Sequence, residues 1–105
     1  MGAIEKFGLS ATLNDFSQKQ FEGFQMGVIV ASRDAFVSFN PSTNDGVSAS
    51  AFVRGQTVRK AIEAGILTGV TVQQVDELKP HIVTWLADEI QKHVKTVMTA
   101  PIDPN

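Results

Sequence analysis

The sequence predicts a mainly α-helical domain, a small bundle of three main helices plus a short connector helix. Two observations lead to this prediction. Apolar residues recur at the three- and four-residue spacing of amphipathic helices, and helix start and stop signals bracket the segments that carry them. The 105 residues suit a single domain over 1–105, and the hydrophobic fraction of 43% and charged fraction of 19% are ordinary for a globular protein.

The first helix is expected to begin near Ser17. Ser17 and Gln20 have the spacing of a capping box, and Phe16 and Phe21 have the spacing of a hydrophobic staple. We treat residues 1–12, before this start, as an irregular N-terminal segment. One face of the helix then carries apolar residues at helical spacing: Phe21, Phe24, Val28, Ala31 and Ala35.

An α+β fold with a hairpin at 27–39 is the alternative. The stretches "GVIVA" and "AFVSF" are rich in valine and phenylalanine and would form two strands linked by Arg33 and Asp34. A two-residue hairpin loop favours glycine or asparagine, which tolerate a positive φ, and this link contains neither. The helix is therefore favoured.

The middle of the chain predicts a loop and then a second helix. Residues 40–49 contain a proline, an Asn-Asp-Gly run and serines, which are typical of a loop. The second helix should begin near Ser48 or Ser50 and end at Ala64, because Gly65 stands where a left-handed C-cap is expected.

Two further helices are expected after Gly65. Thr71 and Gln74 form a second capping box, which begins a short helix that reaches about Lys79. Pro80 suits the first turn of the last helix, which should run to about Met98. Residues 99–105 are expected to form an extended tail.

Composition argues against several functions. The chain has no cysteine, which excludes disulfides, thiolate catalysis and cysteine-based zinc sites. A net charge of −2 lacks the basic excess typical of proteins that bind nucleic acids or membrane surfaces. No spacing of residues indicates a catalytic, cofactor-binding or metal-binding site, so we expect a protein that is not an enzyme. Without a secretory signal or a long apolar run, we expect a cytoplasmic location.

Apolar side chains outside the core stripes predict a protein interface. On a helical wheel, Met26, Val30 and Val37 lie opposite the face of the first helix that we assign to the core. Trp85 lies outside the main apolar stripe of the last helix, and tryptophan is enriched among the residues that dominate interfaces. The alternative for Trp85 is that it covers the neighbouring connector helix. We therefore expect a protein-interaction module that binds another protein or itself, as an oligomer.

A helix-turn-helix-like DNA-binding regulator is the alternative function. The stretch "AIEAGILTGVTVQQV" has a glycine turn between two helices. Acidic residues beside the glutamines of the second helix argue against this function. The candidate DNA contacts are Arg54, Arg59, Lys60, Gln73 and Gln74.

The segments "VRKAIEAGIL" and "VTVQQVDELKPHIVTWLADEI", followed by the proline-containing end "APIDPN", resemble small proteins of tailed phages, of the tail-assembly-chaperone-like kind. The resemblance covers about half of the chain. It implies a non-enzymatic role in virion morphogenesis, in which the protein binds another virion protein or assembles with itself, and it implies a virion-associated location as an alternative to the cytoplasm. It offers no catalytic residues to carry over.

Overall fold

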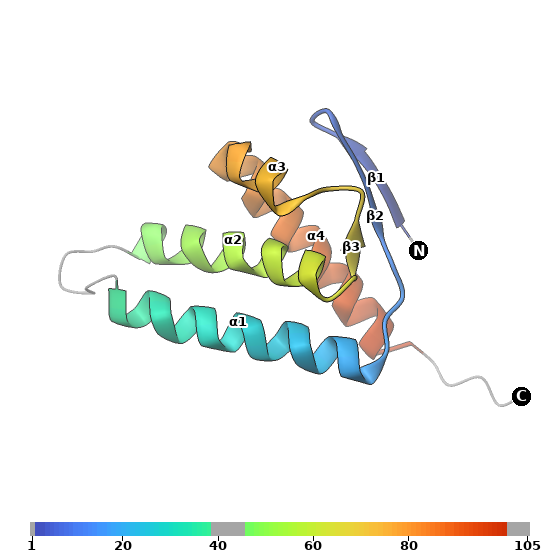
Figure 1. The fold of residues 1–105 in the computed structure, drawn as a ribbon, viewed down its shortest axis with the longest axis horizontal. Helices are drawn as coiled ribbons and strands as arrows, with labels where there is room; N and C mark the ends of the chain where they lie inside the picture. The colour runs from blue at the N-terminus through green and yellow to red at the C-terminus, as the bar shows by residue number, and fades with distance from the viewer. Residues whose placement is uncertain (1, 39–45, 101–105) are drawn as a thin grey trace, which may run out of the picture.

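The computed structural model describes residues 2–38 and 46–100. In chain order these residues form β1 (Gly2–Lys6), β2 (Leu9–Leu13), α1 (Gln18–Ser38), α2 (Gly46–Glu63), β3 (Leu67–Thr68), α3 (Val72–Glu77) and α4 (Pro80–Met98) (Figure 1). The fold is therefore mainly α, as the sequence predicted, with three main helices and one short helix. It also contains a small antiparallel sheet.

The region in which the alternative hairpin was placed is helical. α1 continues without interruption through residues 27–38, so the hairpin predicted there is wrong, and Phe39 lies outside the described residues. An α+β description is nevertheless consistent with the structure, because a hairpin does exist at another place in the chain. It is formed by β1 and β2.

The N-terminal segment that the sequence analysis treated as irregular forms this hairpin. Phe7 and Gly8 connect the two strands, and both have a positive φ, of 56° and 76° respectively. Positive φ at both turn residues is the geometry whose twist suits a two-residue hairpin. In β2 the sequence "LSATL" alternates apolar and polar side chains, and the apolar ones are buried. The alternation turns one face of the hairpin toward the core.

The strand order in the sheet is β1-β2-β3, and both pairs are antiparallel. β3 joins the end of β2 because Thr68 pairs with Thr12 and Leu67 pairs with Leu13. Asn14 strengthens this junction: its side-chain nitrogen donates to the carbonyl oxygen of Gly65 at 3.2 Å and to Oγ1 of Thr68 at 3.0 Å. The hairpin is thereby fixed to the segment that follows α2.

α2 ends at Glu63, one residue before the predicted end at Ala64, and it begins earlier than predicted. Gly65 has a φ of 80°, its N–H donates to Ile62 at 3.1 Å, and the N–H of Ile66 donates to Ala61 at 2.9 Å. These two bonds define a Schellman C-cap. The helix starts at Gly46, so residues 46–49 of the predicted 40–49 loop are helical, whereas residues 40–45 lie outside the described part of the chain.

Both predicted capping boxes are present. At the start of α1 the N–H of Ser17 donates to Oε1 of Gln20 at 2.8 Å, and the N–H of Gln20 donates to Oγ of Ser17 at 3.2 Å. The rings of Phe16 and Phe21 are stacked with centroids 6.4 Å apart, which completes the staple. Thr71 and Gln74 make the same pair of bonds at the start of α3.

α4 has the bounds that the sequence predicted. Lys79 is extended, with φ −67° and ψ 146°, and Pro80 occupies the first turn, so the chain bends between α3 and α4. Of the predicted tail over 99–105, Thr99 forms the C-cap of α4. Residues 101–105 lie outside the described residues.

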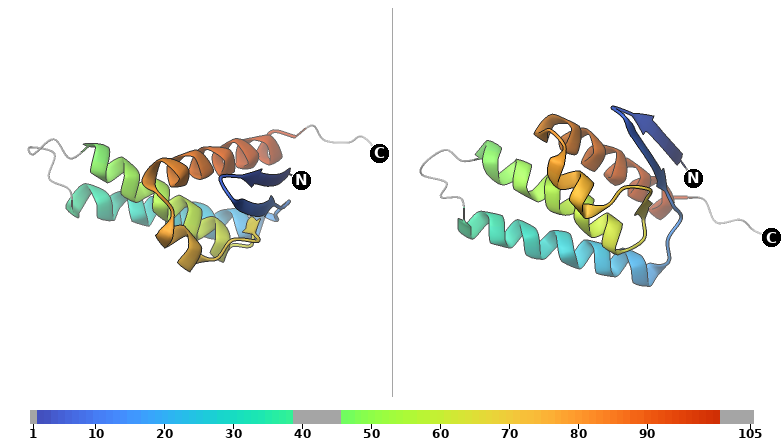
Figure 2. Two further views of the ribbon diagram at one scale, coloured as in Figure 1. Left: turned by 90° about the horizontal axis from the view of Figure 1, so that it is seen from above. Right: turned by 45° about the horizontal axis from the view of Figure 1, so that its top comes forward.

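α2 is the central helix and contacts α1, α3 and α4. α1 and α2 lie side by side, α4 crosses on another side of α2, and the sheet lies at one end, beside α4 (Figures 1 and 2). α1 is therefore an edge helix, which contacts the rest of the domain mainly through α2. The largest fully buried side chains of the core are Phe24, Ile66, Leu67, Leu86, Ile90 and Val58.

Candidate protein-interaction surface

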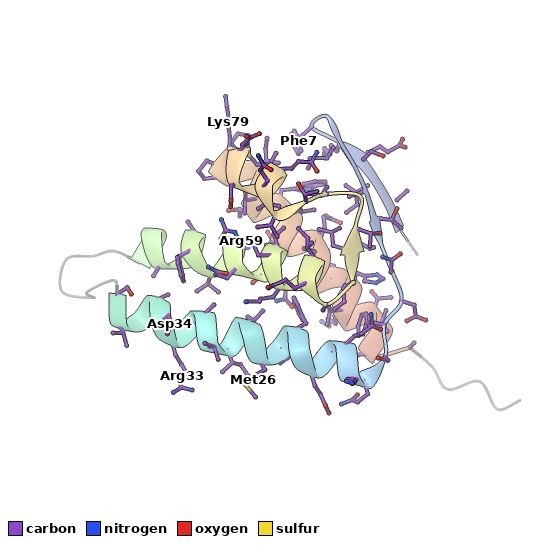
Figure 3. The ribbon with its side chains drawn as sticks, in the orientation of Figure 1. Phe7, Met26, Arg33, Asp34, Arg59 and Lys79 are labelled. Carbon is purple, nitrogen blue, oxygen red and sulfur yellow. The ribbon has the colours of Figure 1, made fainter. Side chains whose placement is uncertain are left out.

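α1 carries large apolar side chains on the side that faces away from the domain. Met26 and Arg33 project from this side in Figure 3, away from α2. Four apolar residues on this side remain exposed, and we call them the α1 stripe: Met26 (61% exposed), Ile29 (44%), Val30 (44%) and Val37 (84%). Three of these residues were predicted as interface residues from the sequence, and Ile29 was not.

The core face of α1 lies on the opposite side of the helix. Phe24, Ala31 and Ala35 are 0%, 6% and 2% exposed. At about 100° per residue, Phe24 and Met26 are separated by about 200° around the helix axis. α1 is therefore apolar on two opposite faces, of which the domain covers only one. Helices that are apolar on two opposite faces are usually buried on both faces.

A groove between α1 and α2 runs beside the α1 stripe. Its volume is about 380 Å³, and it is bordered on the α1 side by Met26 and Val30. The α2 side supplies Phe52, Gln56 and Lys60, and Gly27, Ala31 and Asp34 complete the lining. The apolar surface of α1 thus continues into a depression between α1 and α2.

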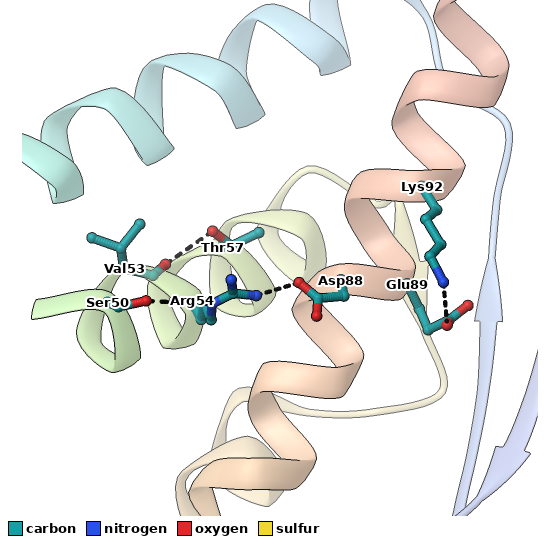
Figure 4. A network of polar contacts seen from close by, with 7 residues as sticks. All are labelled: Ser50, Val53, Arg54, Thr57, Asp88, Glu89 and Lys92. Carbon is teal, nitrogen blue, oxygen red and sulfur yellow. Dashed lines mark hydrogen bonds and ion pairs between the residues drawn. The ribbon is translucent and has the colours of Figure 1, made fainter. Parts of the chain in front are cut away.

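A second groove lies between α1, α2 and α4. It has a volume of about 440 Å³ and is lined mainly by small side chains, among them Val28, Ala35, Ala49 and Val53. An ion pair between Arg54 and Asp88 spans its border, from α2 to α4 (Figure 4). This contact connects two helices of the domain.

Trp85 lies apart from the α1 stripe. Its ring packs against Phe7 at the tip of the hairpin, with centroids 5.2 Å apart in an edge-to-face arrangement, and Nζ of Lys6 lies 5.5 Å from its ring centre. Trp85 is half-buried, whereas Phe7 is 49% exposed. The structure therefore does not bring the four predicted interface residues together. Trp85 contacts the hairpin, in a segment that the sequence predicted to be irregular.

Four of the five candidate DNA contacts are engaged within the domain. Gln74 belongs to the capping box of α3, and Gln73 is exposed on the same short helix. The stem of Lys60 packs over Gly27, where an added Cβ would lie 2.7 Å from it. All three cations form ion pairs with acidic residues: Arg54 with Asp88, Arg59 with Asp76 at 2.6 Å, and Lys60 with Glu63 at 3.1 Å. Each pair places a negative charge beside the cation, which weakens the attraction of these three side chains for a phosphate.

Other kinds of site find no support in the part of the chain that the structure describes. Residues 2–38 and 46–100 contain no group of three or more histidine, aspartate or glutamate side chains placed to hold a metal ion. No helix among them is long and apolar enough to cross a bilayer. Comparison with protein-family models, curated proteins and solved structures found no match for this chain.

Two exposed apolar residues were missed from the sequence. Ile29 is three residues after Met26, and this spacing alone places both on one helical face. Phe7 was missed because residues 1–12 were not recognised as a hairpin. His93 is half-buried, and its Nε2 lies 2.7 Å from the carbonyl oxygen of Asn14, so His93 ties α4 to the end of β2.

Proposed function

We propose that this protein is a non-enzymatic interaction or assembly module that binds another protein chain through the α1 stripe. The observation that carries this proposal is the exposure of four large apolar side chains on one face of an edge helix, opposite its buried face. Monomeric domains rarely expose contiguous apolar surface of this kind unless it serves binding. The groove between α1 and α2 extends the same surface.

The energetics of this surface favour binding by a complementary partner. Complete burial of a large apolar side chain contributes about 1.5–3 kcal/mol, and the stripe supplies four such side chains. Because they are already partly covered by their own helix, the gain on binding is smaller than that total. Association costs about 4–15 kcal/mol in lost freedom, so the stripe needs further contacts from the adjoining groove.

The resemblance to tail-assembly-chaperone-like proteins supports a morphogenesis role for this module. In that role the protein would hold another virion protein, or copies of itself, during tail assembly. The location would be the cytoplasm during assembly, or the virion if the protein stays with its partner. An apolar helix face suits this task, because it binds an amphipathic helix without requiring a particular polar group.

Site-specific photocrosslinking tests the proposal. A photoreactive phenylalanine analogue is placed at Val30, within the stripe, or at Val72, which is 36% exposed on α3, a helix that packs on α2. Both variants are illuminated in the cells that make the protein. We expect covalent protein adducts at position 30 and few at position 72, whatever the partner is.

Equal yields at the two positions would contradict the proposal, as would the absence of adducts at position 30. Mass spectrometry of each adduct identifies the partner as a second copy of this chain or a different protein. An adduct with a tail component would support the morphogenesis role.

A further inference from the structure

We infer that the α1 stripe binds a second copy of this chain, with the two α1 helices antiparallel about a twofold axis. The axis passes near the midpoint between residues 27 and 28. This inference rests on the proposed function and specifies the partner of the same surface.

The outer face of α1 is self-complementary about this midpoint. Met26 lies as far before it as Ile29 lies after it, and Glu22 lies as far before it as Arg33 lies after it. All four side chains are exposed. In a twofold antiparallel pair, residues at equal distances from the axis on opposite sides face each other. Met26 of each copy then contacts Ile29 of the other.

The spacing of the same residues fits helix pairing. Glu22, Met26, Ile29 and Arg33 are separated by four, three and four positions, which is the alternation of a helix seam. Two apolar residues occupy the centre of this seam and charged residues occupy its two ends. This order buries the apolar pair and leaves the charges at the border, where solvent still reaches them.

The charges select the antiparallel orientation. It places Glu22 of each copy beside Arg33 of the other, and the symmetry makes two such pairs. A parallel pair would place glutamate beside glutamate and arginine beside arginine, which is unfavourable. In one copy Glu22 accepts a hydrogen bond from Nε2 of Gln18 at 3.1 Å. Within the described residues Arg33 makes no ion pair, and its side chain is exposed.

The same arrangement covers Val37, which at 84% is the most exposed of the large apolar side chains that the structure describes. Gln18 of the second copy lies at the same distance from the axis as Val37, and the aliphatic stem of the neighbouring Lys19 would pack on Val37. The contact runs from residue 18 to residue 37, about 29 Å at 1.5 Å per residue. An interface limited largely to one helix pair is small, so we expect a concentration-dependent dimer with a dissociation constant near the micromolar range.

Charge reversal with rescue tests this geometry. The dimer dissociation constant is measured by sedimentation equilibrium for the wild type, Glu22→Arg, Arg33→Glu and the double variant. Each single reversal creates two like-charge contacts, and we expect it to raise the constant about tenfold or more. The double reversal restores both ion pairs with exchanged signs and should return the constant close to the wild-type value. Matched controls are Glu77→Arg and Lys95→Glu, exposed residues on other helices, which should change it little.

Cysteine crosslinking tests the orientation directly, because the chain contains no cysteine. Glu22→Cys and Arg33→Cys are purified separately and oxidised alone or as a mixture. In the antiparallel pair the two copies of position 22 are about 16 Å apart along the direction of the helices, which is too far for a disulfide. The mixture should therefore give a disulfide-linked heterodimer, and each variant alone should give little.

The outcomes separate this inference from the proposed function. A wild type that stays monomeric up to millimolar concentration, a double reversal without rescue, or crosslinking of each variant alone would overturn the antiparallel pair. If photocrosslinking at Val30 then captures a different protein, the proposed function still holds. If it captures nothing, both are wrong. A dimer that shows rescue and crosslinks only in the mixture supports the inference.

Discussion

Gly69 provides a stringent test of how the N-terminal hairpin packs on the segment after α2. Its φ is 89°, and an added Cβ would lie 2.7 Å from the carbonyl oxygen of Ser10 and 3.1 Å from Cα of Ala11. Left-handed backbone costs an L-residue about 1–2 kcal/mol. Displacing the backbone of β2 adds about 1–3 kcal/mol, as other overpacked sites do. The two contributions add, and partial relaxation of the backbone around Gly69 reduces their sum. We therefore expect Gly69→Ala to lower the free energy of unfolding by about 2–4 kcal/mol.

Substitutions at two other glycines separate the cost of the left-handed backbone from the cost of the steric overlap with β2. Gly8 has a φ of 76° with open space around its Cβ position, so Gly8→Ala should cost only the conformational term of about 1–2 kcal/mol. Gly23 lies within α1 without a positive φ and also faces open space, so Gly23→Ala should stabilise the protein by about 0.5–1 kcal/mol. Urea unfolding followed by the helical circular dichroism signal gives all three values. A loss for Gly69→Ala no larger than that for Gly8→Ala would refute the close approach between Gly69 and β2.

Three further predictions follow from other contacts. A double-mutant cycle of Phe7→Ala and Trp85→Ala, measured by urea unfolding, should give a coupling free energy of about 0.5–1.5 kcal/mol, and additive effects would show that the two rings do not interact. Thr71→Ala removes the hydroxyl that caps α3 and should cost about 1 kcal/mol by the same assay, whereas an unchanged midpoint would show that the capping box contributes nothing. Random duplex DNA should not bind at low ionic strength, as measured by fluorescence anisotropy, because the candidate cations are paired within the domain. Binding that weakens steeply with added salt would restore the DNA-binding alternative.

The helices were predictable because their signals are local. Ser17 with Gln20 and Thr71 with Gln74 lie within one turn of each other, and the C-cap at Gly65 depends on the residues beside it. Interactions of this kind require no knowledge of the rest of the fold. The starts of α1 and α3, the end of α2 and the bounds of α4 therefore followed from the sequence.

The sheet was missed because most of its signals are not local. The turn contains Phe7, a bulky residue that rarely adopts a positive φ, and β3 has only two residues, which pair with a strand far away in the sequence. The alternation in "LSATL" was the one local indication of a strand. Phe7 has a positive φ, and its ring contacts Trp85. This contact joins residues far apart in the sequence, so the local sequence around Phe7 does not indicate it.

The candidate interface residues also divide into those that local sequence predicts and those that depend on contacts distant in the sequence. Met26, Val30 and Val37 could be predicted to be exposed, because one helical wheel relates them to the buried face of α1. Ile29 was predictable from the same wheel and was overlooked. The surroundings of Trp85 were not predictable, because they depend on a hairpin formed by residues that the sequence predicted to be irregular.

The most direct test of the central claim is the molecular mass in solution, measured by light scattering after size exclusion over a range of concentrations. The proteins compared are the wild type, Val30→Asp and the matched control Val72→Asp, an exposed valine on α3, with circular dichroism to verify that each is folded. We predict that the wild type and Val72→Asp form dimers as concentration rises and that Val30→Asp remains a folded monomer. A wild type that is monomeric throughout, or a Val30→Asp variant that dimerises as well as the wild type does, would contradict self-association through the α1 stripe.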